Sequence, residues 1–341
     1  MQTQRKSNVE LLRIVAILLI IFSHFSRHGF MVLFDDLDMI PGTINRVFLR
    51  STYLGNLGSV IFVIISGYFL CNSKKVTLRK LLSMVIQVWT YSMLGYLICG
   101  LYLQGISFSI KDFFVALTPL IHKVSWFFSC YILLYIIHPY LNMVIRNLNK
   151  DEYIKLLIVS LLLWSFIPVI FHISFYDNDL IQFILFYFIG AYLRVYDPQI
   201  KPLYVCIGVV SMFVMWCGLH LLLELLSVSS YIKDVSLLLA DKNSPFVILT
   251  AVLICYVFLK ANLKYNPLIN EMASCVGGIY LIHDNPYVRK IIFNDIFQLE
   301  GIVNSSYLPF WVSGFVLIVF VSCYFVEKTR KCIYNKCESI F

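Results

Sequence analysis

Charged residues are scarce in this chain. Asp, Glu, Lys and Arg make up only 13% of its 341 residues, whereas a soluble domain usually carries about a quarter. Hydrophobic residues make up 60%, and the mean hydropathy is +0.82. So few charges cannot cover the surface of a soluble protein of this length. The composition therefore excludes an ordinary soluble enzyme and predicts a polytopic, all-α membrane protein whose partner is the lipid bilayer.

The motifs of common soluble enzymes are also absent. The sequence contains no GxSxG elbow, no P-loop, no GxGxxG after a strand, no HExxH and no CxxC pair. Most of the ten cysteines lie within apolar runs, where a thiol behaves as a small hydrophobic group. The net charge of +8 comes from short basic groups between apolar runs rather than from a basic arm, so it does not indicate a nucleic-acid partner. No cleavable signal sequence is expected, because the first run is long, holds Arg13 and is not followed by a small-residue cleavage site.

Apolar stretches near twenty residues long predict membrane-spanning helices. We expect ten spans, of which the eighth and ninth are short: 8–28, 55–72, 81–103, 126–146, 153–172, 180–195, 203–226, 245–260, 268–286 and 307–327. With the N-terminus inside, eighteen of the 27 basic residues fall on the cytoplasmic side. This bias follows the positive-inside rule and predicts that both termini are cytoplasmic. The connections are loop-sized, so residues 1–341 are expected to form one membrane domain without an attached soluble domain.

The first apolar run, NVELLRIVAILLIIFSHF from Asn8 to Phe25, carries three ionisable side chains, Glu10, Arg13 and His24. Ionisable groups are costly in hydrocarbon and usually face the protein interior, where they serve function. Arg13 and His24 are eleven residues apart, which is about three helical turns or 16 Å, so both lie on one helix face. We expect this face to line a reaction path through the membrane. A histidine there suits a general base or an acyl-accepting nucleophile.

Each of these residues also has a purely structural interpretation. His24 can simply be hydrogen-bonded near the helix end. Arg13 can extend to the cytoplasmic interface and pair with Glu10, one turn earlier. In the functional interpretation, Arg13 meets an anionic group, because its planar guanidinium binds phosphate through two hydrogen bonds. The loop SKKVTLRKLL offers Lys74, Lys75 and Arg79 either as plain cytoplasmic anchors or as contacts for the phosphates of a cofactor.

Further histidines lie near the outer ends of the predicted spans. His283, in GGIYLIHDNPY, is predicted at the depth of His24, because Pro286 ends or kinks the helix there. It either caps its span or joins His24 in one acceptor-side site. His28 lies four residues after His24, a spacing that suits a metal pair, but no third ligand is evident, so we predict no metal site. Glu224, near the outer end of the seventh span, is expected at the membrane interface.

Several stretches together resemble the acyltransferase-3 family of integral membrane O-acyltransferases. The opening span, with an arginine, ten intervening residues and a histidine, is similar to that family's first span. The other similar stretches follow in the family's order: Ile61–Leu70 (IFVIISGYFL), Trp126–Asn142 (WFFSCYILLYIIHPYLN), Phe186–Leu193 (FYFIGAYL) and Ile279–His283 (IYLIH). The basic loop differs from many members, because Lys80 and Ser83 stand where a further arginine is common.

The resemblance implies about ten spans and transfer of an acyl group, usually acetyl from acetyl-CoA, to a hydroxyl of a polysaccharide or lipid-linked oligosaccharide. Arg13 and His24 match the family's arginine–histidine pair. The chain is expected to act in the plasma membrane and to deliver the acyl group itself or to pass it to a separate extracytoplasmic transferase. The alternative is a polytopic transporter or flippase of a lipid-linked oligosaccharide, although the chain lacks the internal repeats usual in that class.

Overall fold

The structure is a computed structural model that describes residues 6–30, 37–171 and 178–338. Helices account for most of these residues, and no strand is present among them, which confirms the predicted all-α class. The α-helices are α1 (Ser7–His24), α3 (Thr43–Thr52), α4 (Leu57–Leu70), α5 (Leu78–Leu94), α6 (Ile110–Leu117), α7 (Trp126–Asn147), α8 (Lys150–Leu161), α9 (Ile167–Phe171), α10 (Asp179–Val195), α11 (Pro202–Leu225), α12 (Ser230–Leu237), α13 (Pro245–Lys260), α14 (Pro267–Ser274), α15 (Val276–His283), α16 (Pro286–Lys290), α17 (Leu299–Ile302) and α18 (Leu308–Glu338). Short π- or 3-10-helical segments join or extend them: η1 (Phe25–Phe30), η2 (Leu37–Met39), η3 (Tyr53–Asn56), η4 (Gly95–Leu103), η5 (Leu162–Phe166), η7 (Leu238–Ala240) and η8 (Ile291–Ile296).

Eight helical stretches in the described part of the chain are long and apolar enough to cross a membrane. They are Ser7–Phe30, Thr43–Leu70, Leu78–Leu103, Trp126–Asn147, Lys150–Phe171, Pro202–Leu225, Tyr231–Lys260 and Leu308–Tyr334. This finding confirms a polytopic membrane protein. The sidedness of the two termini stays a prediction.

Two of the ten expected spans are not among these eight stretches. The sixth, near 180–195, is the 17-residue helix α10, most of which is buried among other helices. The ninth, near 268–286, is not one helix, because the chain breaks at Cys275 between α14 and α15 and again before α16. The second break occurs where Pro286 disfavours continuation of the helix, as the sequence predicts.

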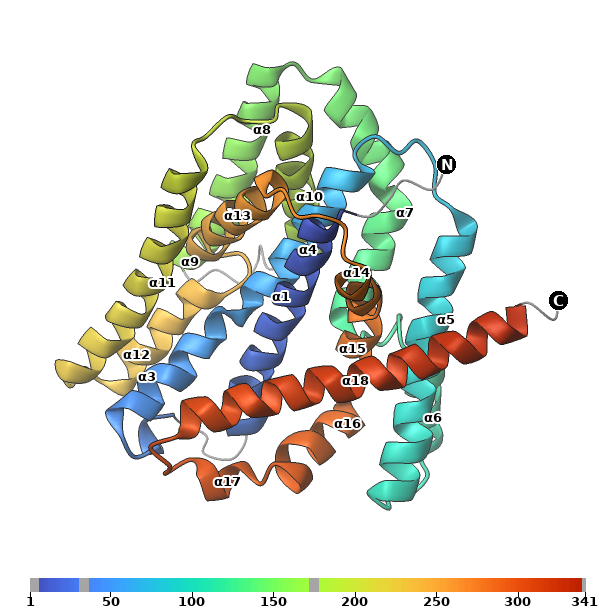
Figure 1. The fold of residues 1–341 in the computed structure, drawn as a ribbon, viewed down its shortest axis with the longest axis vertical. Coiled ribbons are helices and arrows are strands. Elements are labelled where there is room, and N and C mark those ends of the chain that lie inside the picture. The colour runs from blue at the N-terminus through green and yellow to red at the C-terminus, as the bar shows by residue number, and fades with distance from the viewer. Residues whose placement is uncertain (1–5, 31–36, 172–177, 339–341) are drawn as a thin grey trace.

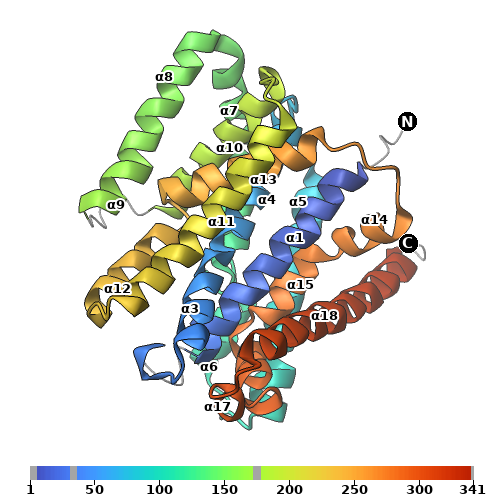
Figure 2. The same ribbon diagram turned by 60° about the vertical axis from the view of Figure 1, so that its left-hand side comes forward.

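Helix α1 lies in the middle of the bundle, and α18 runs obliquely along one side of it (Figures 1 and 2). Glycines bring the next span against α1. A Cβ atom on Gly55 would lie 2.1 Å from the backbone oxygen of Leu19, and one on Gly58 would lie 2.2 Å from that of Ala16. Small residues let helices approach this closely in membranes. The position of α1 is therefore set by backbone contacts on the side that faces α4.

The same device joins α4 to α10. A Cβ atom on Gly67 would lie 2.1 Å from the oxygen of Tyr187, and one on Gly190 would lie 2.0 Å from the oxygen of Ile64. Each glycine thus receives the backbone of the other helix. Two of the stretches that resemble the acyltransferase-3 family, IFVIISGYFL and FYFIGAYL, contain these glycines. In this chain both stretches therefore serve to pack α4 against α10.

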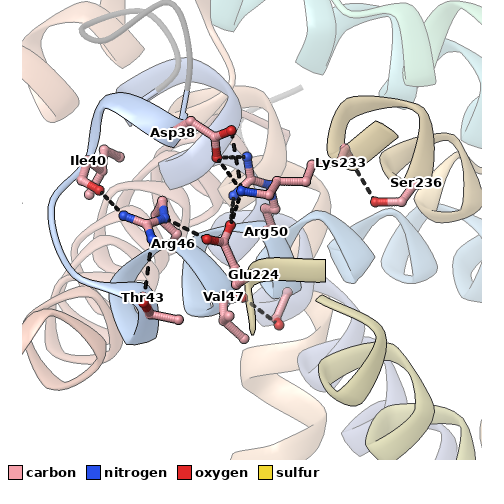
Figure 3. Close-up of polar contacts among 10 residues, drawn as sticks. Asp38, Ile40, Thr43, Arg46, Val47, Arg50, Glu224, Lys233 and Ser236 are labelled. Atoms are coloured by element: carbon pink, nitrogen blue, oxygen red, sulfur yellow. Dashed lines mark hydrogen bonds and ion pairs between the residues drawn. The ribbon is translucent and has the colours of Figure 1, made fainter. Parts of the chain in front are cut away.

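A network that we call the ion-pair cluster joins α3, α11 and α12 (Figure 3). Its members are Asp38, Arg46, Arg50, Glu224 and Lys233. Arg50 donates to Glu224 and to Asp38 at 2.7 Å each, and Arg46 donates to Glu224 at 2.9 Å. Lys233 lies 3.1 Å from the Glu224 carboxylate. Glu224 lies at the end of α11, as the sequence predicts, but its side chain is paired inside the protein and is only 2% exposed. Its depth in the membrane stays a prediction.

Asp38 belongs to the ion-pair cluster but lies outside the spans. Burial would raise the pKa of its carboxyl group, but hydrogen bonds from Arg50 and Lys233 outweigh burial and hold that pKa below its ordinary value. A buried cation needs such pairing, since an isolated charge in a low-dielectric interior is strongly unfavourable. Arg46, Arg50 and Lys233 thus serve to hold helices together.

Candidate functional site

The histidine at the end of α1 contacts the histidine at the end of α15. His24 Nδ1 and His283 Nε2 are 3.1 Å apart, although 259 positions separate them in the sequence. His283 is fully buried, and the His24 side chain is only 12% exposed. Helix α15 lies beside α1 in both views of the ribbon (Figures 1 and 2). The two residues that the sequence places at one depth are therefore direct neighbours.

The hydrogen bonds of this pair assign its tautomers when both rings are neutral. His283 Nδ1 lies 2.6 Å from the carbonyl oxygen of Ile279, one turn earlier, so this nitrogen must carry the proton and donate. His283 Nε2 then has a lone pair and accepts from His24 Nδ1–H. The Nε2 atom of His24 is left with a lone pair. That is the form that a general base or a nucleophile requires.

Three more polar side chains surround the pair. Asp284 Oδ1 lies 3.6 Å from both His24 Nδ1 and His28 Nε2. The rings of His24 and His28 are 4.8 Å apart between centroids. Arg289 Nη1 lies 3.5 Å from His28 Nε2 and 3.6 Å from Asp284 Oδ1. We call these five residues the histidine cluster: His24, His28, His283, Asp284 and Arg289.

Part of the histidine cluster has the spacing of a metal site. One ligand atom each from His24, His28 and Asp284 lies within 4.8 Å of the other two, so Asp284 is the third ligand that the sequence did not reveal. However, Arg289 already places a fixed positive charge beside the ligand atoms of His28 and Asp284. A divalent cation there would be repelled. We therefore assign no metal to this group.

An apolar cavity of about 120 Å³ adjoins the cluster. Side chains from α1, α4, α7 and α15 line it, including Ile20, Phe62 and Phe127. Tyr280 lines it as well, and the ring of Tyr280 lies 6.4 Å from that of His24 and 5.9 Å from that of His283. The cavity is therefore separated from the two imidazoles by little more than one aromatic ring.

The face of α1 that holds Arg13 and His24 also reaches this cavity. Residues 13 to 24 lie within one continuous α-helix, so the eleven-residue spacing does place both on one face. Ile20 lies between them on that face, and it lines the cavity. Arg13 does not line it; its Nη1 donates to Glu10 Oε1 at 2.7 Å, which is the pairing the sequence predicted.

The basic loop between α4 and α5 lies at the end of the bundle where α1 begins (Figure 1). Lys74, Lys75 and Arg79 are exposed, and the interactions described for the chain do not bring them onto α1. Lys80 instead lies over the Tyr135 ring, with its Nζ 4.9 Å from the centroid. Part of the surface of each of these three side chains is therefore accessible at that end of the bundle.

Sequence reasoning missed Asp284 and Arg289. Asp284 directly follows His283 within the apolar stretch, so an ionisable neighbour was visible there. Arg289 lies in a segment that reads as an ordinary outer loop, and only the turn of α16 brings it back to His28. Nothing in the sequence distinguishes Tyr280 from the other apolar residues of its helix. Only the structure shows that its ring lies between the cavity and the two imidazoles.

Comparison with known families identifies the chain. A family model described as an acyltransferase domain, Acyl_transf_3, matches residues 6–327. Neither the curated proteins nor the solved structures contain a match. The family model covers far more than half of the chain, and the described residues include eight helices able to cross a bilayer. The chain therefore belongs to the acyltransferase-3 family and is a multi-pass membrane acyltransferase.

Proposed function

We propose that this protein is an O-acyltransferase of the plasma membrane. It moves an acyl group, with acetyl as the first to test, from acyl-CoA to a hydroxyl of a cell-surface or exported glycan. Family membership supports acyl transfer. The observation that carries the proposed chemistry is the 3.1 Å contact between His24 and His283, which leaves the Nε2 atom of His24 able to accept a proton.

His24 acts as the general base in this proposal. Its Nε2 takes the proton from the acceptor hydroxyl while that oxygen attacks the thioester carbonyl carbon. His283 holds the His24 ring in the required tautomer, and the Asp284 carboxylate, 3.6 Å from His24 Nδ1, stabilises the imidazolium that forms. Asp284 and His283 act through His24 and are positioning residues.

Attack of the hydroxyl oxygen on the thioester carbon forms a tetrahedral intermediate, which then collapses. Its negative oxygen needs a positive partner, and Arg289 supplies the guanidinium of the histidine cluster, with a side chain that is 34% exposed. The carbon–sulfur bond breaks, and the thiolate of coenzyme A takes the proton from His24. The products are the acylated glycan and free coenzyme A, and His24 returns to its neutral form.

The same lone pair permits a second route. His24 Nε2 can attack the thioester first and carry the acyl group to the hydroxyl in a second step. Both routes use the same residues, and they differ in whether acyl-histidine forms in the absence of the glycan. The buried setting favours transfer over hydrolysis in either case, because few water molecules reach a side chain that is 12% exposed.

The donor is proposed to enter from the cytoplasm. Its phosphates would meet Arg13 and the exposed side chains of Lys74, Lys75 and Arg79, and its pantetheine arm would run from there toward His24. Arginine and lysine at that end of the bundle supply the charge that phosphates require. A separate extracytoplasmic transferase would be needed only if the glycan cannot reach His24 itself.

Transfer of labelled acetyl tests the proposal. Membranes that contain the protein are incubated with acetyl-CoA labelled in the acetyl group and with surface glycan from the same cells. We expect label in the glycan as a base-labile ester. The His24→Ala variant should transfer no label, and His122→Ala, a change of an exposed histidine, should transfer as much as the wild type. Labelled glycan formed by the His24→Ala variant would contradict the assigned role.

A further inference from the structure

The apolar cavity beside the histidine cluster offers a means of selecting the donor. We propose that it holds the acyl chain of the donor thioester and that Gly277 limits the length of the chain accepted. This inference rests on the proposed function, because it deepens the use of the same site.

The location of the cavity points to the donor. Ile20 places it on the face of α1 between Arg13, where the phosphates are proposed to bind, and His24, where the acyl carbon must react. Tyr280 borders both the cavity and the His24 ring. A thioester whose carbonyl carbon lies at His24 would therefore have its alkyl end within reach of this space.

The lining has the chemistry of an alkyl binding site. Apolar atoms supply almost all of its surface. Three of the lining residues carry hydroxyls. Those of Ser66 and Tyr131 lie 3.1 Å apart and hydrogen-bond to each other, and the third belongs to Tyr280, whose ring also borders His24. Most sugar hydroxyls placed here would lose their bonds to water without replacement, which disfavours the glycan as occupant.

The volume of the cavity limits the length of the acyl chain that it can hold. An apolar cavity of about 150 Å³ is known to hold a benzene molecule, so about 120 Å³ accommodates a chain of a few carbons. An acetyl group alone leaves most of this space unfilled. We therefore expect the wild-type protein to accept acyl groups of about two to four carbons.

Gly277 is the position at which the space can be reduced. A Cβ atom there would point at Phe128, 3.3 Å from its Cζ atom, and both residues line the cavity. A valine at this position would press on the Phe128 ring and reduce the space between these two lining residues. The space left would still receive acetyl but not a longer chain.

The test compares donors of increasing length. Membranes with wild-type protein, Gly277→Val or Phe62→Ala are given acetyl-, butyryl- and hexanoyl-CoA with the glycan acceptor, and acylated product is measured. For Gly277→Val we expect the ratio of butyryl to acetyl transfer to fall about tenfold or more relative to wild type, as one or two misfitting methylenes cause. Phe62→Ala should gain transfer of hexanoyl.

Gly314→Val is the matched control. It introduces the same side chain into α18, where a Cβ atom meets no other atom within 4 Å. It should leave the ratio of butyryl to acetyl transfer unchanged. If Gly277→Val leaves that ratio unchanged as well, or lowers both donors equally, the cavity proposal is wrong while acyl transfer stands. If the wild type uses no acyl-CoA at all, the proposed function itself fails.

Discussion

The ion-pair cluster and the histidine cluster each combine buried and partly exposed side chains, yet they are built in opposite ways. In the ion-pair cluster the guanidinium of Arg50 lies 2.7 Å from each of two carboxylates, and fixed charges of both signs meet at hydrogen-bond distance. In the histidine cluster the Asp284 carboxylate lies 3.6 Å from each of its partners, and three of the five members are imidazoles. In the first cluster each charged side chain is paired with one of opposite charge. In the second, two imidazoles lie at hydrogen-bond distance from each other.

This difference assigns structure to one cluster and chemistry to the other. Closely matched permanent charges hold α3, α11 and α12 together, whereas imidazoles at hydrogen-bond distance are suited to proton transfer. Substitutions in the two clusters should therefore move different observables. The four that follow run from the largest expected effect to the smallest.

Replacing His24 by alanine should lower acyl transfer by about 10²- to 10⁴-fold, the usual contribution of a general base. The fold should be retained, because His24 makes one side-chain hydrogen bond within the described residues. Thermal unfolding in detergent should shift by no more than about 3 °C. If transfer is lost because less folded protein is present, the histidine cluster would have a structural role, as the ion-pair cluster does.

Replacing Glu224 by alanine should have the reverse signature. The change leaves Arg50 buried with one of its two carboxylates gone, and breaking a buried ion pair in this way costs about 3–5 kcal/mol. We expect a clearly lower unfolding temperature and less protein in the membrane. Transfer per folded molecule should stay near that of the wild type, and a specific loss of transfer at unchanged stability would show that the cluster serves the reaction.

His283 tests the positioning role. The His283→Ala variant removes the acceptor that fixes the His24 tautomer, so kcat should fall by about 10- to 100-fold, less than for loss of the base itself. The His283→Gln variant should recover part of the rate, since its amide oxygen can accept the same proton. The profile of kcat against pH should shift in the alanine variant and return toward wild type in the glutamine variant. If both variants lose kcat equally and the pH profile does not shift, His283 has a packing role only.

Acidification should weaken the ion-pair cluster slightly. The pKa of Asp38 is lower in the folded protein than its ordinary value of 3.8, so its carboxylate stabilises the folded state above that value. The contribution is lost as the pH falls through the lowered pKa. Because Asp38 is partly exposed, the loss should be under about 1 kcal/mol. Unfolding temperatures of wild type and Asp38→Asn should converge at low pH and differ at neutral pH.

Much of the architecture followed from the sequence, because hydropathy alone marks most spans. The break at Cys275 did not, since a run of apolar residues reads the same whether the helix is continuous or interrupted. For His283, depth in the membrane left two alternatives, a capped helix end or a shared site with His24, and the structure brings the two rings together. The part played by Arg289 was not foreseen, because a short helix turns it back toward residues far away in the sequence. The ion pairs of Glu224 could not be foreseen either, because its partners lie on α3 and α12, which are far from it in the sequence.

The early end of α15 has a consequence for inhibitor design. A helix that ends at His283 directs its last carbonyl groups, and the negative pole of its dipole, to the place where the imidazolium of His24 is proposed to form. A neutral headgroup that donates hydrogen bonds would suit the same carbonyl groups without repulsion from Arg289. Joined to an alkyl tail of about four carbons, it would match the helix end and the neighbouring cavity in one molecule.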